Sequence, residues 1–144
     1  MKTMTKLIVR NYHIDYFGHM NHARYVELLE EARWRYLEGN NLLGPIHEVG
    51  AFHVVAELAL KYRKPAKIGD ILKIETQIEN RLSHSFKMSQ KAVIEQSGKL
   101  ALEAVVTNVF VNGKGQPRLI DDDILEIWPD LNDFKGSNNI EDLS

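Results

Sequence analysis

A chain of 144 residues is long enough for one globular domain, and its 44% hydrophobic and 26% charged residues are ordinary for a soluble protein. The net charge of −2 argues against a dedicated binder of nucleic acid or membrane surfaces, and no run approaches the ~18 apolar residues of a membrane span. The absence of cysteine excludes disulfides, thiolate zinc sites and cysteine nucleophiles. Residues 1–10 do not resemble a signal peptide, so we expect a cytoplasmic protein.

The first half of the chain predicts a strand, a polar loop and a long helix. β-branched and apolar residues favour a short strand over Thr5–Arg10, and a loop follows. Apolar residues at helical spacing then predict a helix of about four turns over Ala23–Glu38, with Asn21 as its N-cap and residues 39–41 as its stop. The apolar stripe of this helix must lie against a flat apolar surface.

The second half predicts antiparallel strands. After a connecting loop at 44–50, hydrophobic and polar residues alternate with a period of two in four long runs, at 52–62, 72–79, 86–95 and 100–112. In the first run, Phe52, Val54, Leu58 and Leu60 share one parity and are expected on the same face. Such alternation is typical of antiparallel sheets with one covered face. A short helix or turn is expected at Asp121–Trp128.

These elements predict an α+β fold in which one long central helix is wrapped by a curved antiparallel sheet of about five strands. We expect a single domain over residues 1–128 and a loose C-terminal tail over 129–144.

The loop before the helix carries the clearest candidate chemistry. Residues 15–22 read Asp-Tyr-Phe-Gly-His-Met-Asn-His, so a carboxylate stands close to the start of the helix. A helix start offers unpaired N–H groups and the positive end of the helix dipole. A carboxylate beside such donors is suited to attack on a carbonyl group. The alternative is that Asp15 only forms an Asx turn or a cap.

The whole pattern resembles the hotdog-fold acyl-CoA thioesterases of the 4-hydroxybenzoyl-CoA thioesterase-like family. The resemblance rests on Asp-x-x-Gly-His-x-Asn at 15–21, Glu-Glu-Ala-Arg at 30–33, Tyr-Arg-Lys-Pro-Ala at 62–66 and Gly-Asp at 69–70, and it covers residues 5–125. It implies hydrolysis of an acyl-CoA substrate without a cofactor. It also implies a homodimer or homotetramer with active sites between subunits. A single sheet whose long edge strand needs covering agrees with this assembly.

The resemblance also suggests roles for the loop residues. Asp15 would attack the thioester carbonyl, as a nucleophile or as a general base on water, because a thioester is already activated. The backbone N–H of His22 is the implied oxyanion donor. His19 either orients the water or substrate or bonds a loop carbonyl, and Asn21 either holds a water or the thioester oxygen or is only the N-cap. Tyr25, on the apolar stripe, is assigned to the core.

A second thioesterase lineage on this fold carries its carboxylate on the central helix, which makes Glu31 an alternative. We favour a structural role for Glu31, in an ion pair with Arg35 at i+4. The phosphates of CoA favour basic residues at a pocket mouth. The residues implied as CoA contacts lie at strand ends and turns, where ordinary solvated turns are the alternative: Arg63, Lys64, Arg81, Ser83, His84 and Lys87.

The histidines near the loop, at 13, 19 and 22, are not expected to bind a metal, because converging ligands of fixed geometry are needed. The sequence therefore predicts an acyl-CoA thioesterase that releases a free acid and CoA. An acyl-ACP thioesterase and a non-catalytic acyl-CoA-binding module are the alternatives.

Overall fold

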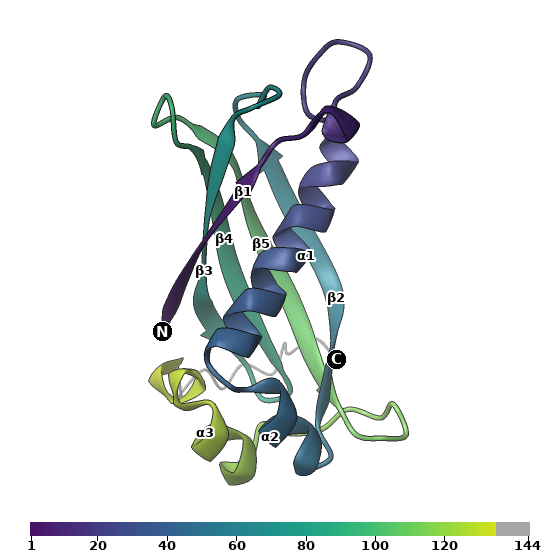
Figure 1. Ribbon diagram of the computed structural model, residues 1–144. Coiled ribbons are helices and arrows are strands. Elements are labelled where there is room, and N and C mark those ends of the chain that lie inside the picture. The colour runs from purple at the N-terminus through teal and green to yellow at the C-terminus, as the bar shows by residue number, and fades with distance from the viewer. Residues whose placement is uncertain (135–144) are drawn as a thin grey trace.

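The computed structural model describes residues 1–134 and contains five strands and one long helix (Figure 1). The elements in chain order are β1 (Lys2–Ile8), η1 (Asn11–His13), α1 (His22–Gly39), α2 (Leu43–Glu48), β2 (Phe52–Tyr62), β3 (Ile71–Arg81), β4 (Ser85–Ile94), β5 (Leu100–Val111), α3 (Asp122–Ile127) and η2 (Pro129–Phe134).

All five strands form one antiparallel sheet in the order β1-β3-β4-β5-β2. Helix α1 lies across one face of the sheet, and α2 and α3 lie at the end where α1 finishes (Figure 1). The predicted α+β class, with one long helix on an antiparallel sheet of five strands, is confirmed. Strands β1 and β2 stand at the two edges, and neither pairs on its outer side with another strand within residues 1–134.

Helix α1 forms where the sequence predicted it, one residue longer at each end. Asn21 caps it, because its side-chain oxygen accepts a hydrogen bond from the N–H of Ala23 at 2.8 Å. One face of the helix is buried against the sheet and the terminal helices, through Tyr25, Leu29, Ala32, Tyr36 and Leu37.

A buried polar side chain of the sheet fixes the middle of α1. Gln90 on β4 is fully buried, and its amide nitrogen donates to the carbonyl of Leu29 at 2.9 Å and to the hydroxyl of Thr76 at 3.1 Å. Its amide oxygen accepts from Arg33 at 3.0 Å. A satisfied polar network of this kind specifies one seating of the helix on the sheet.

Two parts of the sequence-based prediction are wrong in detail. Strand β1 covers residues 2–8 and not 5–10. The segment 44–50 is not only a loop, because α2 occupies Leu43–Glu48. Pro45 stands in the first turn of this helix, where its missing N–H costs no hydrogen bond, and Ile46 anchors the helix in the core.

A β-bulge between Val55 and Glu57 shifts the parity of β2. His53 and Val55, opposite the buried Phe110 and Asn108, therefore face α1 together with Leu58 and Leu60. We expected Phe52 and Val54 on that face. This expectation is wrong, since the extra residue reverses which side chains point inward.

The expected tail also begins later than residue 129. Residues Pro129–Phe134 form η2, and Leu131 is fully buried in the cluster that contains Trp128, Phe86 and Phe110. This apolar side chain extends the core past the predicted boundary at 128. The rest of the expected tail, residues 135–144, lies outside the described residues.

We predict that Leu131→Ala lowers the free energy of unfolding by about 2–5 kcal/mol, because it leaves a cavity in the core. Leu119→Ala is the matched control: Leu119 is 55% exposed, so its truncation should stay within about 0.5 kcal/mol of wild type. Urea unfolding measures both. Equal, small effects would show that η2 does not belong to the cooperative core.

Candidate active site

The loop before α1 holds Asp15 by short-range hydrogen bonds. One carboxylate oxygen, Oδ1, accepts from the backbone N–H of Phe17 at 2.8 Å and of His19 at 3.3 Å. Gly18 has a φ of +79°, a conformation that glycine adopts without strain, and its N–H donates to the carbonyl of Asp15 at 3.1 Å. The Asx turn that the sequence offered as the alternative role of Asp15 is therefore present, and it involves only the Oδ1 atom. No group within residues 1–134 hydrogen-bonds the second oxygen, Oδ2.

The backbone of Ala66, just after β2, ties this loop and the helix start to the sheet. Its carbonyl accepts from the N–H of Met20 at 2.8 Å, and its N–H donates to the hydroxyl of Tyr25 at 3.0 Å. The hydroxyl of Tyr62 donates to the carbonyl of His22 at 2.9 Å. Tyr25 is 4% exposed, which confirms its predicted place in the core, and burial raises the pKa of its hydroxyl.

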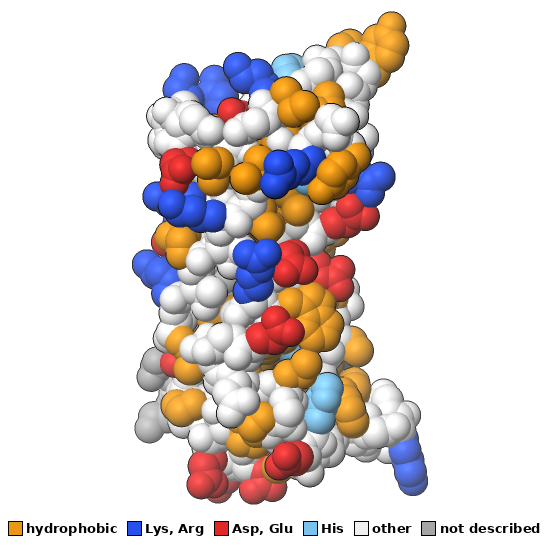
Figure 2. All heavy atoms as spheres, viewed as in Figure 1, with side chains coloured by type: hydrophobic (Ala, Val, Ile, Leu, Met, Phe, Trp, Pro, Cys, Tyr) orange, Lys and Arg blue, Asp and Glu red, His pale blue; other side chains and the backbone are white. Residues whose placement is uncertain are grey.

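A cleft of about 250 Å³ opens at this point, at the end of the molecule where α1 begins. Its lining brings together most of the predicted catalytic residues and two of the predicted CoA contacts: Asp15, His19, Met20, His22, Tyr25, Tyr62, Arg63, Lys64 and Pro65. In Figure 2 basic side chains gather at this end of the visible face. The cleft therefore offers a carboxylate and cationic groups to the same ligand.

Some of the polar groups at the helix start are engaged in hydrogen bonds, and others are open to the cleft. The side-chain oxygen of Asn21 is engaged as the N-cap, so its capping role is the one that the structure shows. The backbone N–H of His22 has no acceptor within residues 1–134, as expected for the first turn of a helix. The side chains of His19 and His22 both border the cleft.

The predicted CoA contacts are not all in one place. Arg63 and Lys64 line the cleft, and Arg63 forms an ion pair with Glu103 at 2.9 Å. The turn between β3 and β4, which carries Arg81, Ser83 and His84, lies at the opposite end of the sheet from Asp15 in the same chain, and Lys87 follows it on β4. The guanidinium of Arg81 donates to the carbonyls of Leu131 at 2.8 Å and Leu82 at 3.2 Å, which is a structural role.

The carboxylate of Glu31 is engaged on the exposed side of α1, where it pairs with Arg35 at 3.1 Å. This ion pair is the structural role that the i+4 spacing favoured. Within residues 1–134 no cluster of three histidine or acidic side chains is arranged to hold a metal ion. No helix in the same range is long and apolar enough to cross a membrane.

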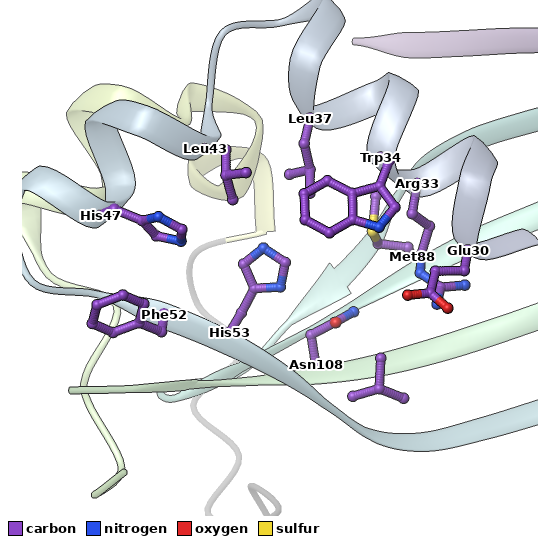
Figure 3. A pocket seen from close by; sticks show the side chains of 11 residues that line it. Glu30, Arg33, Trp34, Leu37, Leu43, His47, Phe52, His53, Met88 and Asn108 are labelled. Carbon is purple, nitrogen blue, oxygen red and sulfur yellow. The ribbon is translucent and has the colours of Figure 1, made fainter. Parts of the chain in front are cut away.

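A second cavity, of about 240 Å³, lies toward the other end of α1, between α1, α2 and the start of β2 (Figure 3). Its walls are largely apolar, with a few polar side chains among them: Glu30, Arg33, Trp34, Leu37, Leu43, His47, Phe52, His53, Val55, Met88 and Asn108. The sequence does not indicate this cavity, because simple alternation along β2 places His53 on the outer face. The signal that could have located the cavity is His53, a histidine between hydrophobic residues, which the bulge turns inward.

His53 is enclosed by aromatic rings at the bottom of this cavity. Its ring centroid lies 5.6 Å from that of Phe86, 5.9 Å from that of Phe110 and 6.2 Å from that of Trp128. Burial lowers the pKa of His53 to about 4, and the neighbouring Asn108 side chain only partly opposes this shift. The imidazole is therefore neutral at physiological pH. Its Nε2 atom is buried without a hydrogen-bond partner within residues 1–134.

Comparisons with known proteins agree with this architecture. Residues 9–128 match the family described as the thioesterase-like superfamily. FadM, a long-chain acyl-CoA thioesterase of Escherichia coli strain K12, is 36% identical over 115 residues, which cover 80% of this chain and 87% of FadM. The crystal structure of YbaW, a probable thioesterase from Escherichia coli, superposes with a TM-score of 0.83 at 30% identity and covers 89% of this chain and 97% of YbaW.

A third structure shows the fold alone, because its sequence is only 18% identical. It is Slr0204, a 1,4-dihydroxy-2-naphthoyl-CoA thioesterase from Synechocystis, with a TM-score of 0.78 and coverage of 92% of this chain and 98% of Slr0204. The chain belongs to the thioesterase-like superfamily. It is a thioester hydrolase, and the family predicted from residues 15–21 and the strand pattern is confirmed.

The buried imidazole of His53 predicts a loss of stability in acid. The unfolded chain takes up a proton on this residue near pH 6.5, and the folded chain only near pH 4, so the free energy of unfolding falls as the pH drops through that interval. Between pH 7 and pH 5 we expect His53 to account for about 1–2 kcal/mol of this fall. Urea unfolding of wild type and His53→Phe at both pH values measures the difference. Identical acid sensitivity in the two proteins would contradict the burial of a neutral His53.

Proposed function

We propose that this protein hydrolyses acyl-CoA thioesters to a free acid and CoA, with Asp15 carrying the attack on the carbonyl. The observation that supports this most directly is the geometry of the Asp15 carboxylate. One oxygen is fixed by two backbone N–H groups, and the other has no partner within residues 1–134, at the edge of a cleft of about 250 Å³. The similarity to FadM, named as a long-chain acyl-CoA thioesterase, agrees with the substrate class.

Two routes use the same carboxylate. As a general base, Asp15 takes a proton from water, the hydroxide adds to the thioester carbon, and the tetrahedral intermediate collapses to acid and CoA thiol, which receives the proton. As a nucleophile, Asp15 forms an acyl anhydride and releases CoA thiolate, and water then hydrolyses the anhydride. In both routes the unpaired backbone N–H of His22 is the oxyanion donor that we propose.

The remaining polar side chains have supporting parts in this proposal. His19 and His22 border the cleft and orient water or the thioester, and Asn21 acts through the helix start that it caps. Arg63 and Lys64 provide cationic groups for the phosphates of CoA. The contacts predicted for Arg81, Ser83, His84 and Lys87 would require a CoA bound to another copy, and they stay predictions, as does a cytoplasmic location.

We also propose that the working form is a homo-oligomer, a dimer or tetramer, built on pairing of the β2 edges of two copies. The outer edge of β2 is unpaired within residues 1–134. Apolar side chains are exposed on the same flank: Trp34 on α1 is 42% exposed, Val54 is 51% and Val55 is 50%. A long unprotected edge with exposed valines is a ready surface for another strand, and a second copy supplies that strand.

Replacing the carboxylate tests the catalytic assignment. We expect Asp15→Asn to lower kcat on acyl-CoA by about 10²–10⁴-fold, because the amide can neither accept the proton of water nor attack the carbonyl. Steady-state hydrolysis of acyl-CoA thioesters over a range of chain lengths measures the effect.

The matched control is Glu31→Gln, which removes the helix carboxylate used by the second thioesterase lineage and should leave kcat unchanged. A folded Asp15→Asn protein with full activity would remove Asp15 from the mechanism. Acyl-ACP of the same chain length, assayed in parallel, tests the carrier: faster turnover on acyl-ACP would favour an acyl-ACP thioesterase. Saturable binding of acyl-CoA without turnover would identify a binding module.

A charge on the β2 edge tests the assembly. We expect wild type to be a dimer or tetramer and Val54→Lys to shift it toward monomer, with at least about a tenfold loss of activity, because two charged edges repel and remain hydrated. Met4→Lys is the control on the other edge strand, where Met4 is 50% exposed. Light scattering coupled to gel filtration measures the mass. A fully active wild-type monomer would contradict the proposal.

A further inference from the structure

We propose that the cavity between α1, α2 and β2 is an acyl-group pocket selecting chains that carry an uncharged oxygen substituent, a carbonyl or a hydroxyl, which Arg33 and His53 recognise. This inference rests on the proposed function and adds the class of acyl group to it. The cavity lies apart from the Asp15 cleft, and no sequence motif identified it.

Arg33 is the first polar group that needs a partner in the cavity. Its side chain comes from α1 and is partly buried, and one nitrogen donates to Gln90 at 3.0 Å. A guanidinium carries five N–H donors, so most of them are left for a ligand. No carboxylate within residues 1–134 lies within ion-pair distance of it. Burial lowers the pKa of Arg33, as expected for a cation removed from water, and the group remains charged.

His53 is the second polar group in the cavity that needs a partner. It enters from β2, opposite α1, and its buried Nε2 has no partner within residues 1–134 (Figure 3). A buried polar nitrogen without a hydrogen bond is unfavourable, and an oxygen atom placed in the cavity removes that cost. Because a neutral imidazole nitrogen either donates or accepts, it can serve a carbonyl or a hydroxyl.

The charges around the cavity favour an uncharged ligand group. The carboxylate of Glu30 lies on the same side as Arg33 in Figure 3 and balances its charge at a distance, while His53 is neutral. An incoming carboxylate would meet Glu30, and beyond Arg33 the lining offers only the imidazole rings of His47 and His53 to offset it. The walls contributed by Trp34 and Met88 suit a hydrocarbon chain on either side of the oxygen.

The position of the cavity explains how a thioester at the Asp15 cleft reaches it. The two sites lie at opposite ends of β2: Phe52 and His53 border the cavity, and Tyr62 borders the cleft. Antiparallel pairing of two β2 edges brings the start of one strand beside the end of the other. Under this pairing, the acyl group of a thioester held at one copy's cleft can enter the other copy's cavity, whereas within one chain roughly 16 Å of α1 separates His22 from Arg33.

The experiment compares binding of matched acyl-CoA pairs, each an unsubstituted chain and the same chain with one oxo or hydroxyl group at successive positions. Isothermal titration on the Asp15→Asn background avoids turnover. We expect at least about a tenfold preference for the oxygenated chain at one position, because a site built to bond an oxygen discriminates against chains that lack it. Adding His53→Phe, which keeps the aromatic packing, or Arg33→Gln should reduce that preference to about threefold or less.

Arg35→Gln is the matched control, since Arg35 lies on the same helix but pairs with the exposed Glu31. It should keep the full preference. Equal affinity for both members of every pair, or a preference that survives both His53→Phe and Arg33→Gln, would overturn the inference. Because the readout is binding, a failure of wild type to hydrolyse acyl-CoA would count against the proposed function alone.

Discussion

The placement of the candidate active site depends on the backbone N–H and carbonyl of one residue, Ala66. Its N–H bonds the buried hydroxyl of Tyr25 on α1, and its carbonyl bonds the N–H of Met20 at the end of the Asp15 loop. Ala66 follows Arg63 and Lys64 closely in the chain, so the same anchor sets the distance between the carboxylate and the cationic groups. The loop's own hydrogen bonds shape the turn around Asp15. The contacts to Ala66, the bridge between His19 and Lys67 and the hydrogen bond from Tyr62 to the carbonyl of His22 orient that turn relative to the sheet and the start of the helix.

The edge strand β2 connects this anchor to the rest of the proposed chemistry. It ends at the cleft and begins at the second cavity, while its outer edge and nearby apolar side chains lack a covering strand within residues 1–134. Under the proposed pairing, one copy supplies the carboxylate and the oxyanion donor, and the other supplies the pocket for the acyl group. A thioester is then positioned by both copies before attack, which is how orientation contributes to lowering a barrier.

Much of this arrangement could be predicted from local sequence signals. The spacing of Tyr25, Leu29 and Ala32 defines the buried face of α1, and the loop motif before it identifies the Asp15 cleft. The orientation of His53 could not be predicted, because a bulge inserts one residue and reverses the alternation on which the prediction relied. The burial of Leu131 depends on Phe86 and Trp128, which meet it only in the folded chain, so a short segment after Pro129 looked like a tail. The basic residues predicted to bind CoA lie at two ends of the sheet because of strand direction: β3 begins near the cleft and runs away from it, so the turn that follows β3 lies at the opposite end.

In the proposed arrangement, the Asp15 cleft binds the thioester while the acyl group lies against His53 of a paired copy. A crystal structure of the Asp15→Asn protein with a bound oxo- or hydroxyacyl-CoA tests it most directly. We predict that the thioester carbon lies about 3–3.5 Å from the substituted side chain. The carbonyl oxygen should accept a hydrogen bond from the N–H of His22, and the chain oxygen should lie between His53 and Arg33 of the second copy. A thioester bound away from residue 15, or an acyl chain directed out of the second cavity, would contradict it.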